Sequence, residues 1–285
     1  MGQAKVKADE SPIQKTDEIE VYALVGPSGT GKSSKAIPFA HEKRIPAIID
    51  DGLFIFQGKR VAGNSAKFEK HRIAAVKRAT FYDSNHRQEV KKAIQARQIS
   101  KVLILGTSVR MVEVIAEKLE LGRIDHYIDI KQVSNSKEIK LALFMRKTKG
   151  NHVMPLPSGQ IKESLLKRLI KKSIKIFSPQ KEVIGESTIV QPEFQKDILH
   201  IADDVYHQLI TLSCNSFKEV HSVGKVSFQI EKFPRAMIDL NIFYSYSDVL
   251  MEVIESIQQK VYDDFDAYLN LEMDSVDVRV IRLVE

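Results

Sequence analysis

Hydrophobic and polar residues follow one another along the first part of the chain in the order expected of a parallel α/β sheet. Four apolar runs are typical of strands, and the stretches between them carry apolar residues at helical spacing. The expected strands are VYALVG (21–26), IPAIIDDGLFIF (45–56), KVLILGTS (101–108) and HYIDIKQV (126–133), and the expected helices lie near 32–43, 66–79, 86–97, 109–120 and 136–148. The pattern predicts an α/β domain, which we place at residues 19–177.

The last third of the chain has a different periodicity. A polar, turn-rich run, SPQKEVIGEST (178–188), predicts a linker, after which the expected order of elements is β-α-β-β-α-β. The elements are a strand at TIV, a helix from Pro192 to about Leu212, strands at KVSFQIEKF and AMIDLNIFYSY, a helix over 247–269 and a strand at SVDVRVIRLV. We therefore expect a small α+β domain at residues 189–285 and a disordered tail at residues 1–18.

One apolar stripe runs along the helix expected at 247–269, with carboxylates on the opposite face. Because such stripes normally pack into a core, we interpret it as core and not as a cofactor site. The stripe consists of Leu250, Val253, Ile254, Ile257, Val261, Phe265 and Leu269.

Composition indicates the cellular compartment of the protein, and the charge distribution divides the chain into two parts. The single cysteine, Cys214, excludes an intramolecular disulfide and a thiolate metal cluster, and no segment has the pattern of a signal peptide or a membrane span. We expect a cytoplasmic protein. Residues 1–180 hold 34 Lys and Arg against 18 Asp and Glu, a balance of +16, whereas residues 181–285 have a balance of −10. Two domains of opposite charge are predicted.

The segment GPSGTGKS (26–33) follows the first apolar run and fits the pattern G-x-x-x-x-G-K-[ST]. Its glycines permit a tight loop, and successive backbone N–H groups up to Ser34 can surround a phosphate at the start of the next helix. Lys32 adds a charge for the β- and γ-phosphates, and the Ser33 hydroxyl is placed to ligate Mg²⁺. The motif indicates a P-loop NTPase domain whose ATP contacts come from Gly26, Pro27, Ser28, Gly29, Thr30, Gly31, Lys32, Ser33 and Ser34.

A Mg²⁺ site also needs an acid, and KVLILGTS ends without one. Asp50 and Asp51 follow the strand in IPAIIDDG, where α/β folds place their ligands. Locally, GPSGTGKSSKAIPFAHEKRIPAIIDDG is similar to the HPr kinase/phosphorylase pattern, a resemblance that implies metal binding and base catalysis by such an acid. We expect Ser33 and Asp50 to hold Mg²⁺ and Lys32, Asp50 and Asp51 to serve catalysis. A capped strand end is the alternative for the two aspartates.

Other polar residues have a structural interpretation beside a functional one. Arg146, Lys147 and Lys149 could close over the γ-phosphate, but cations are common at helix ends, and this second interpretation is favoured. Thr107 and Ser108 could contact phosphate, but capping of the next helix is favoured. The basic stretch 58–97 is interpreted first as a solvated face, then as a surface for an acidic partner, and last as a nucleic-acid surface.

The segment ESLLKRLIKKSIKIF (163–177) has the pattern of a basic amphipathic helix. Packing against the first domain is favoured over contact with an anionic membrane. The apolar face would comprise Leu165, Leu166, Leu169, Ile170, Ile174 and Phe177, and the basic face Lys167, Arg168, Lys171, Lys172 and Lys175.

The last 100 residues or so, from STIVQPEFQKDILHIADDVY through GKVSFQIEKFPRAMIDLNIFYSYS to DVRVIRL, resemble the alkaline shock protein family of bacterial envelope stress response proteins. The resemblance implies a small interaction module without established chemistry. Its acidic helix face is predicted to dock on the basic domain, within the chain or between two copies. This face carries Glu252, Glu255, Asp263 and Asp266.

Together these patterns predict an ATP-binding P-loop protein with a regulatory or stress-related role. Nucleotide would set the arrangement of the domains and be hydrolysed slowly, because no glutamate suited to activating water is identifiable. The alternative is a kinase, for a small substrate or a protein, that uses the same loop with Asp50 and Asp51.

Overall fold

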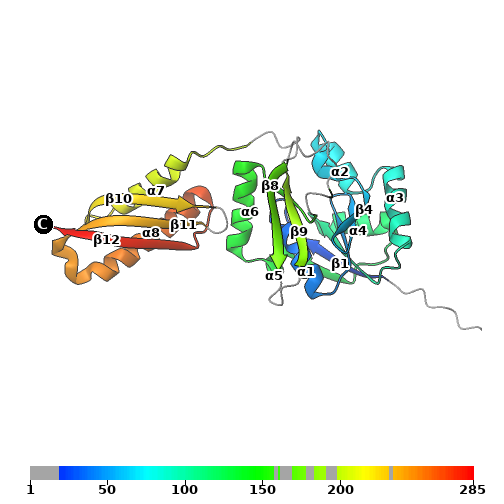
Figure 1. Cartoon of the computed structure of the whole chain (residues 1–285), viewed down its shortest axis with the longest axis horizontal. Helices are drawn as coiled ribbons and strands as arrows, with labels where there is room; N and C mark the ends of the chain where they lie inside the picture. The colour runs from blue at the N-terminus through cyan, green and yellow to red at the C-terminus, as the bar shows by residue number, and fades with distance from the viewer. Residues whose placement is uncertain (1–18, 157–159, 161–168, 178–182, 191–197, 231–233) are drawn as a thin grey trace, which may run out of the picture.

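The computed structural model describes residues 19–156, 160, 169–177, 183–190, 198–230 and 234–285. The expected N-terminal tail lies outside these residues. The chain forms two units that lie end to end in Figure 1: an N-terminal unit up to residue 190 and a C-terminal unit from residue 198. Within the described part, no helix is long and apolar enough to cross a membrane.

A six-stranded, mostly parallel sheet forms the centre of the N-terminal unit, in the order β4-β3-β2-β5-β1-β6. Its strands are β1 (Glu20–Val25), β2 (Ala47–Asp50), β3 (Leu53–Phe56), β4 (Lys59–Gly63), β5 (Lys101–Gly106) and β6 (His126–Asp129). The run expected as one strand at 45–56 is an antiparallel hairpin of β2 and β3. The hairpin turns at Asp51 and Gly52, both with positive φ, because Asp-Gly suits the tight turns that join two strands.

Helices cover both faces of this sheet. They are α1 (Lys32–Glu42), α2 (Arg72–Ala79), α3 (Ser84–Gln95), α4 (Val109–Leu119), α5 (Ile130–Val133) and α6 (Ser136–Lys149), with a 3₁₀ turn η1 (Ala66–Phe68) before α2. One core packs α3 and α4 on the sheet, and the other packs α1 on its opposite face. The predicted helices are found close to their expected bounds, except that the stretch 66–79 divides into η1 and α2.

A second sheet packs beside α1 in the order β7-β9-β8 and is antiparallel throughout. It comprises β7 (His152–Met154), β8 (Leu169–Phe177) and β9 (Val183–Val190). The expected amphipathic helix is therefore wrong for residues 169–177, and residues 163–168 lie outside the described part. Helical spacing of apolar residues was misleading because β9 supplies a hydrogen-bonding partner, and strand formation depends on such context.

Strand β9 also changes the expected boundary between the two parts of the chain. Residues 183–188 of the predicted linker belong to this strand, and Val190 is fully buried in the core beneath α1. The expected strand TIV is thus part of β9 and pairs with β7 and β8 in the N-terminal unit, and does not open the C-terminal sheet.

The C-terminal unit consists of a mixed three-stranded sheet covered by two helices. Its elements are α7 (Asp203–Asn215), β10 (Val220–Gln229), β11 (Arg235–Phe243), η4 (Tyr244–Val249), α8 (Leu250–Leu269) and β12 (Ser275–Val284). Strand β11 lies centrally, antiparallel to β10 and parallel to β12. The described order is α-β-β-α-β, so the predicted β-α-β-β-α-β order is corrected at its first strand. Helix α7 begins at Asp203, eleven residues after the expected start at Pro192, which itself lies outside the described residues.

The apolar stripe of α8 is core, as predicted. Val253 is 8% exposed, and Ile257, Val261 and Phe265 are fully buried against the sheet. Cys214 on α7 lies in the same core. The buried stripe explains why a strongly acidic helix is held firmly on the sheet.

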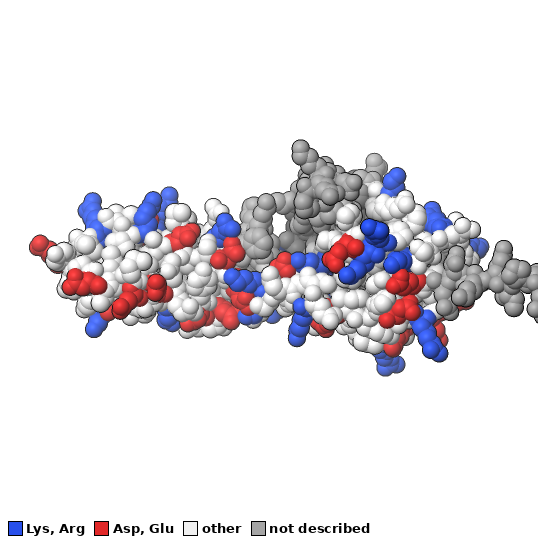
Figure 2. Space-filling view, turned by 90° about the horizontal axis from the view of Figure 1, so that it is seen from below, with Lys and Arg blue, Asp and Glu red and all other residues white. Residues whose placement is uncertain are grey.

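Helix α6 joins the two units. The Phe144 side chain packs in the core of the C-terminal unit, with its ring centroid 6.4 Å from that of Tyr206. The Lys140 ammonium lies 2.5 Å from Asp266 and 3.0 Å from Glu272. Figure 2 shows both acidic and basic side chains along the C-terminal unit and around this junction. Asp266 belongs to the predicted acidic docking face, whose other members, Glu252, Glu255 and Asp263, are exposed.

Candidate nucleotide-binding site

The glycine-rich loop 26–31 joins the carboxyl end of β1 to the amino end of α1. Gly29 and Gly31 have φ values of 91° and 90°, a conformation that side chains disfavour. A Cβ atom on Gly26 would lie 2.5 Å from the Ile130 side chain, so this position also needs glycine. Gly31 offers no side chain to cap the first amides of α1, and the positive end of the helix is left for an anion.

The Lys32 side chain folds back over this loop. Its Nζ atom donates to the carbonyl oxygens of Gly26 at 2.6 Å and Pro27 at 2.9 Å. Burial lowers the pKa of the Lys32 ammonium to about 8, although the nearby Asp50 and Asp51 carboxylates oppose this shift. A cation that is buried against neutral carbonyls would gain from a phosphate partner.

The Ser33 hydroxyl meets the aspartate that the sequence analysis assigned to the same metal. Ser33 Oγ donates to Asp50 Oδ2 at 2.8 Å, although β5 lies between β1 and β2 in the sheet. A hydroxyl and a carboxylate are oxygen ligands of the kind that Mg²⁺ takes together with waters and phosphates. Burial raises the pKa of Asp50, against the effect of the nearby Lys67 ammonium. The two side chains therefore fit one Mg²⁺ shell in chemistry and position.

Lys67 is the residue of this site that sequence reasoning missed. Its ammonium lies 2.5 Å from Asp51 Oδ2 and 3.3 Å from Asp50 Oδ2. Burial of Asp51 opposes its ionisation, but the Lys67 ammonium holds the pKa of this carboxyl below its usual range. In the sequence, Lys67 is one of many lysines and arginines in the basic stretch 58–97, and no pattern separates it from them.

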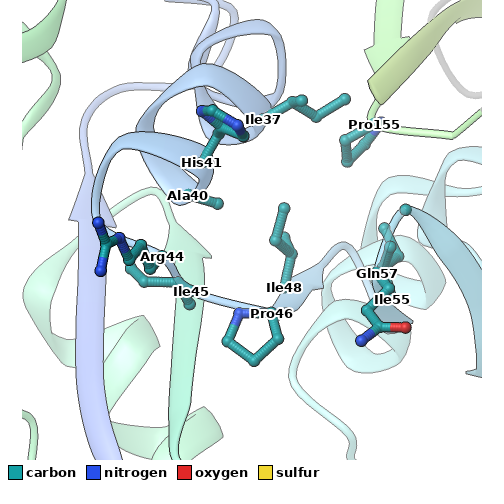
Figure 3. Close-up of a pocket in the computed structure, with 11 residues that line it drawn as sticks. Ile37, Ala40, His41, Arg44, Ile45, Pro46, Ile48, Ile55, Gln57 and Pro155 are labelled. Atoms are coloured by element: carbon teal, nitrogen blue, oxygen red, sulfur yellow. The ribbon is translucent and has the colours of Figure 1, made fainter. Parts of the chain in front are cut away.

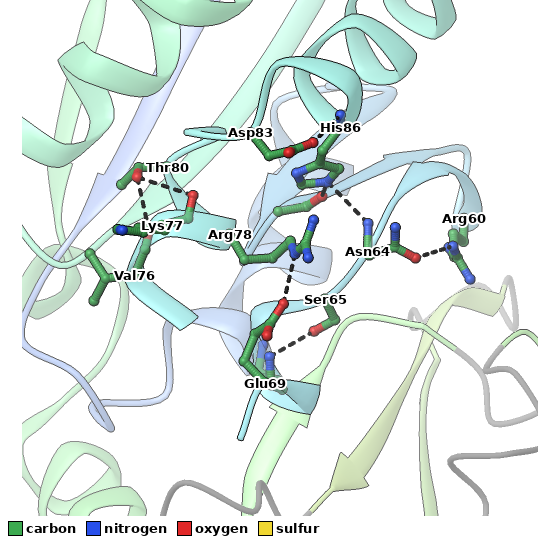
Figure 4. Close-up of polar contacts among 12 residues, drawn as sticks. Arg60, Asn64, Ser65, Glu69, Val76, Lys77, Arg78, Thr80, Asp83 and His86 are labelled. Carbon is green, nitrogen blue, oxygen red and sulfur yellow. Dashed lines mark hydrogen bonds and ion pairs between the residues drawn. The ribbon is translucent and has the colours of Figure 1, made fainter. Parts of the chain in front are cut away.

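Hydrogen bonds of the buried His86 ring, which is drawn in Figure 4, hold the turn after Asp50 in place. The buried His86 ring places Nε2 2.8 Å from the Gly52 carbonyl oxygen and 3.1 Å from the Asn64 backbone nitrogen. At Gly63, where φ is 88°, an added Cβ atom would lie 2.2 Å from the same carbonyl oxygen. This close approach brings the end of β4 against the turn that carries Asp51. The histidine thus has a structural place in the fold.

Arg146, near the end of α6, reaches the loop from the other side. Its Nη1 atom donates to Ser28 Oγ at 3.0 Å, and its side chain lies over Gly29, where an added Cβ atom would be 2.7 Å from Arg146 Cδ. The structure therefore brings Arg146 to the glycine-rich loop, the placement that the sequence analysis weighed less heavily than an ordinary helix end. At the end of β5, Ser108 Oγ accepts from the Met111 backbone N–H at 3.2 Å and caps α4.

A separate cavity of about 360 Å³ lies at the opposite end of α1 (Figure 3). Aliphatic side chains from α1, β2 and β3 line it, and His41 and Arg44 stand beside them. Helix α1 starts at the loop with Lys32 and reaches this cavity with its last turn. The cavity is therefore distinct from the loop site, and the chemistry predicted from the sequence lies outside it.

Neither a scan of protein-family models nor a search of curated proteins gives a match to this chain. The fold itself, a mostly parallel six-stranded α/β sheet, is consistent with that of P-loop proteins.

Proposed function

We propose that this chain is a Mg²⁺-dependent, ATP-binding P-loop protein that uses nucleotide to set the arrangement of its two units and hydrolyses it slowly. One observation carries the proposal: the Ser33 hydroxyl, next to Lys32 at the start of α1, is hydrogen-bonded to the buried Asp50. This contact joins the two halves of a phosphate and metal site that are 17 residues apart in the sequence.

Each group has a defined part in binding. The backbone of residues 27–34 surrounds the phosphates, and Lys32 exchanges its two carbonyl partners for phosphate oxygens. Ser33 and Asp50 hold the metal, which when bound neutralises phosphate charge and polarises the phosphoryl group. Arg146 can turn from Ser28 to a phosphate, because its guanidinium already lies at the loop.

Regulation is proposed because α6 contacts both the loop and the C-terminal unit. Arg146 meets Ser28, while Lys140, six positions earlier on the helix, pairs with Asp266 and Glu272. Six residues of helix span about 9 Å, so one rigid element connects the two contacts. If phosphate draws Arg146 away from Ser28, the position of α6 changes on both sides. Nucleotide would then favour one arrangement of the units through its differential contacts with α6.

A second candidate function is phosphoryl transfer to an acceptor. The observation that favours it is Asp51, whose side chain is 34% exposed while its pKa is kept low against burial by Lys67. An ionised, reachable carboxylate beside the metal ligands can orient an acceptor hydroxyl and accept its proton. In this candidate the loop and Asp50 keep the roles given above.

The proposal is tested by calorimetric titration of ATP, GTP and ADP, with and without Mg²⁺, into the wild-type protein and Lys32→Ala. Loss of a charge-assisted contact should weaken ATP binding by at least about 1–2 kcal/mol. Lys43→Ala, at the exposed C-terminal end of the same helix, is the matched control and should leave binding unchanged. Equal ATP affinity of folded Lys32→Ala and wild type would refute the proposal.

Turnover separates the two candidate functions. Slow release of phosphate, without acceleration by added hydroxyl compounds or proteins, supports nucleotide gating. Rapid transfer of the γ-phosphate to an acceptor, lost in Asp51→Asn, supports the kinase.

A further inference from the structure

The Lys67 ammonium contacts both Asp50 and Asp51, and Asp50 is the carboxylate proposed to hold the metal. The side chains of Lys67 and Asp50 are 5% and 6% exposed, so this ion pair is formed almost out of contact with water. Asp50 Oδ2 is shared: it accepts from Ser33 Oγ at 2.8 Å and faces the Lys67 ammonium at 3.3 Å. The carboxylate proposed to bind Mg²⁺ therefore already has a cation beside it.

The backbone around Lys67 is built to hold it there. The Ser65 hydroxyl caps η1 by accepting from the Lys67 backbone N–H at 3.2 Å. At Ala66, the residue before Lys67, the backbone N–H donates to the Asp51 carbonyl oxygen at 2.8 Å. The short turn that carries the lysine is thus hydrogen-bonded to the turn that carries one of its carboxylate partners.

Charge explains why a cation is needed at this place. Two adjacent carboxylates repel each other, and the buried charge of Asp50 requires a partner. With Lys67 present, the trio of Asp50, Asp51 and Lys67 carries a net charge of about −1 by simple ionic counting. A divalent ion on Asp50 would bring a second cation to the lysine, so the two cations must compete for the same carboxylate.

We propose that Lys67 is the resident counter-cation of Asp50 and Asp51, and that Mg-nucleotide displaces its ammonium from Asp50 to a phosphate oxygen. Lys67 is then a second phosphate-binding lysine beside Lys32. The protein without nucleotide binds free divalent ions weakly, and the metal enters together with the phosphates that receive the lysine. This inference rests on the proposed nucleotide-binding function and adds to it the residue that controls metal entry.

Metal binding in the absence of nucleotide tests the displacement. Mn²⁺ is titrated into the wild type, Lys67→Met, Lys67→Arg and Lys70→Met, and free Mn²⁺ is followed by electron paramagnetic resonance. Removal of the competing charge should tighten Mn²⁺ binding by roughly tenfold or more in Lys67→Met. Lys67→Arg keeps the charge and Lys70→Met changes an exposed lysine on the same segment, so both should bind Mn²⁺ like the wild type. Equal Mn²⁺ affinity in Lys67→Met and wild type overturns the inference.

A second variant keeps the test valid if Lys67→Met does not fold. Lys67→Met combined with Asp51→Asn removes one charge of each sign and preserves the net charge of the trio. Asp50 is then free of its lysine, and this variant should also bind Mn²⁺ more tightly than the wild type. Binding no tighter than the wild type counts against the displacement.

The inference and the proposed function fail in different measurements. Relative to its gain in metal affinity, Lys67→Met should bind Mg-ATP roughly tenfold more weakly, because one charge-assisted phosphate contact is lost. If Mg-ATP affinity instead rises as much as Mn²⁺ affinity does, Lys67 is a counter-cation and the phosphate role is overturned. If the wild type binds no nucleotide at all, the proposed function fails, whereas the Mn²⁺ comparison still reports on Lys67.

Discussion

The half-buried position of Lys32 predicts that nucleotide affinity falls as the pH rises through about 8. Burial lowers the pKa of this ammonium to about 8. Only the charged form can neutralise phosphate, so affinity follows the protonated fraction. At pH 9, one unit above this pKa, roughly one tenth of the Lys32 side chains are charged, which corresponds to about tenfold weaker binding, or 1.4 kcal/mol.

The same shift has a defined sign in protein stability. The folded-state pKa of Lys32 lies below its ordinary value of 10.5, so between about pH 8 and 10.5 the unfolded chain binds more protons than the folded one. Stability rises with pH wherever this is true. The Lys32 contribution to the free energy of unfolding should therefore increase across this window, while nucleotide affinity decreases.

The assay is a titration of ATP at fixed Mg²⁺ and ionic strength from pH 7.5 to 9.5, well above the phosphate pKa of about 6. Lys32→Arg is the control, because its guanidinium remains charged throughout this range. The two proteins are compared by the slope of ATP affinity against pH, because the arginine also changes the absolute affinity. A flat wild-type profile, or an equal slope in Lys32→Arg, would refute the reasoning.

Three further predictions concern the metal, the turn and the junction. Asp50→Asn should still bind nucleotide but lose most of its dependence on Mg²⁺, and an unchanged Mg²⁺ titration would leave Asp50 only a structural role. Gly63→Ala should lower the free energy of unfolding by about 2 kcal/mol or more, measured by urea denaturation, because its Cβ atom would lie 2.2 Å from a carbonyl oxygen. Gly58→Ala, which has no neighbour within 4 Å, is the matched control with backbone strain alone, and equal losses would exclude the steric explanation. The small-angle scattering profile of Lys140→Ala should respond less to salt and to Mg-ATP than the profile of the wild type does. Wild-type profiles that are identical in all conditions would contradict nucleotide gating.

Structural features that depend on residues close together in the sequence could be predicted from the sequence alone. The loop conformation requires glycine at Gly29 and Gly31, and the motif itself contains that requirement. The apolar stripe of α8 likewise predicts its own burial, since the residues on one helix face share one environment. The helices flanking the first sheet and the three C-terminal strands follow for the same reason, although β10 begins at Val220, five residues before the expected strand.

Contacts between distant segments were decided by the tertiary structure. Residues 169–177 became a strand because β9 offered hydrogen-bonding partners that helical spacing does not reveal. Arg146 contacts Ser28, 118 residues away in the chain, and Lys67 contacts Asp50 although β3 and β4 lie between them in the sequence. Among the lysines and arginines of the basic stretch, Lys67 pairs with the aspartates because η1 is hydrogen-bonded to the β2–β3 turn. The sequence determined which groups are proposed to bind phosphate and metal, whereas the fold decided which cation lies beside the acids, because a charge acts through distance in space and not through spacing in the chain.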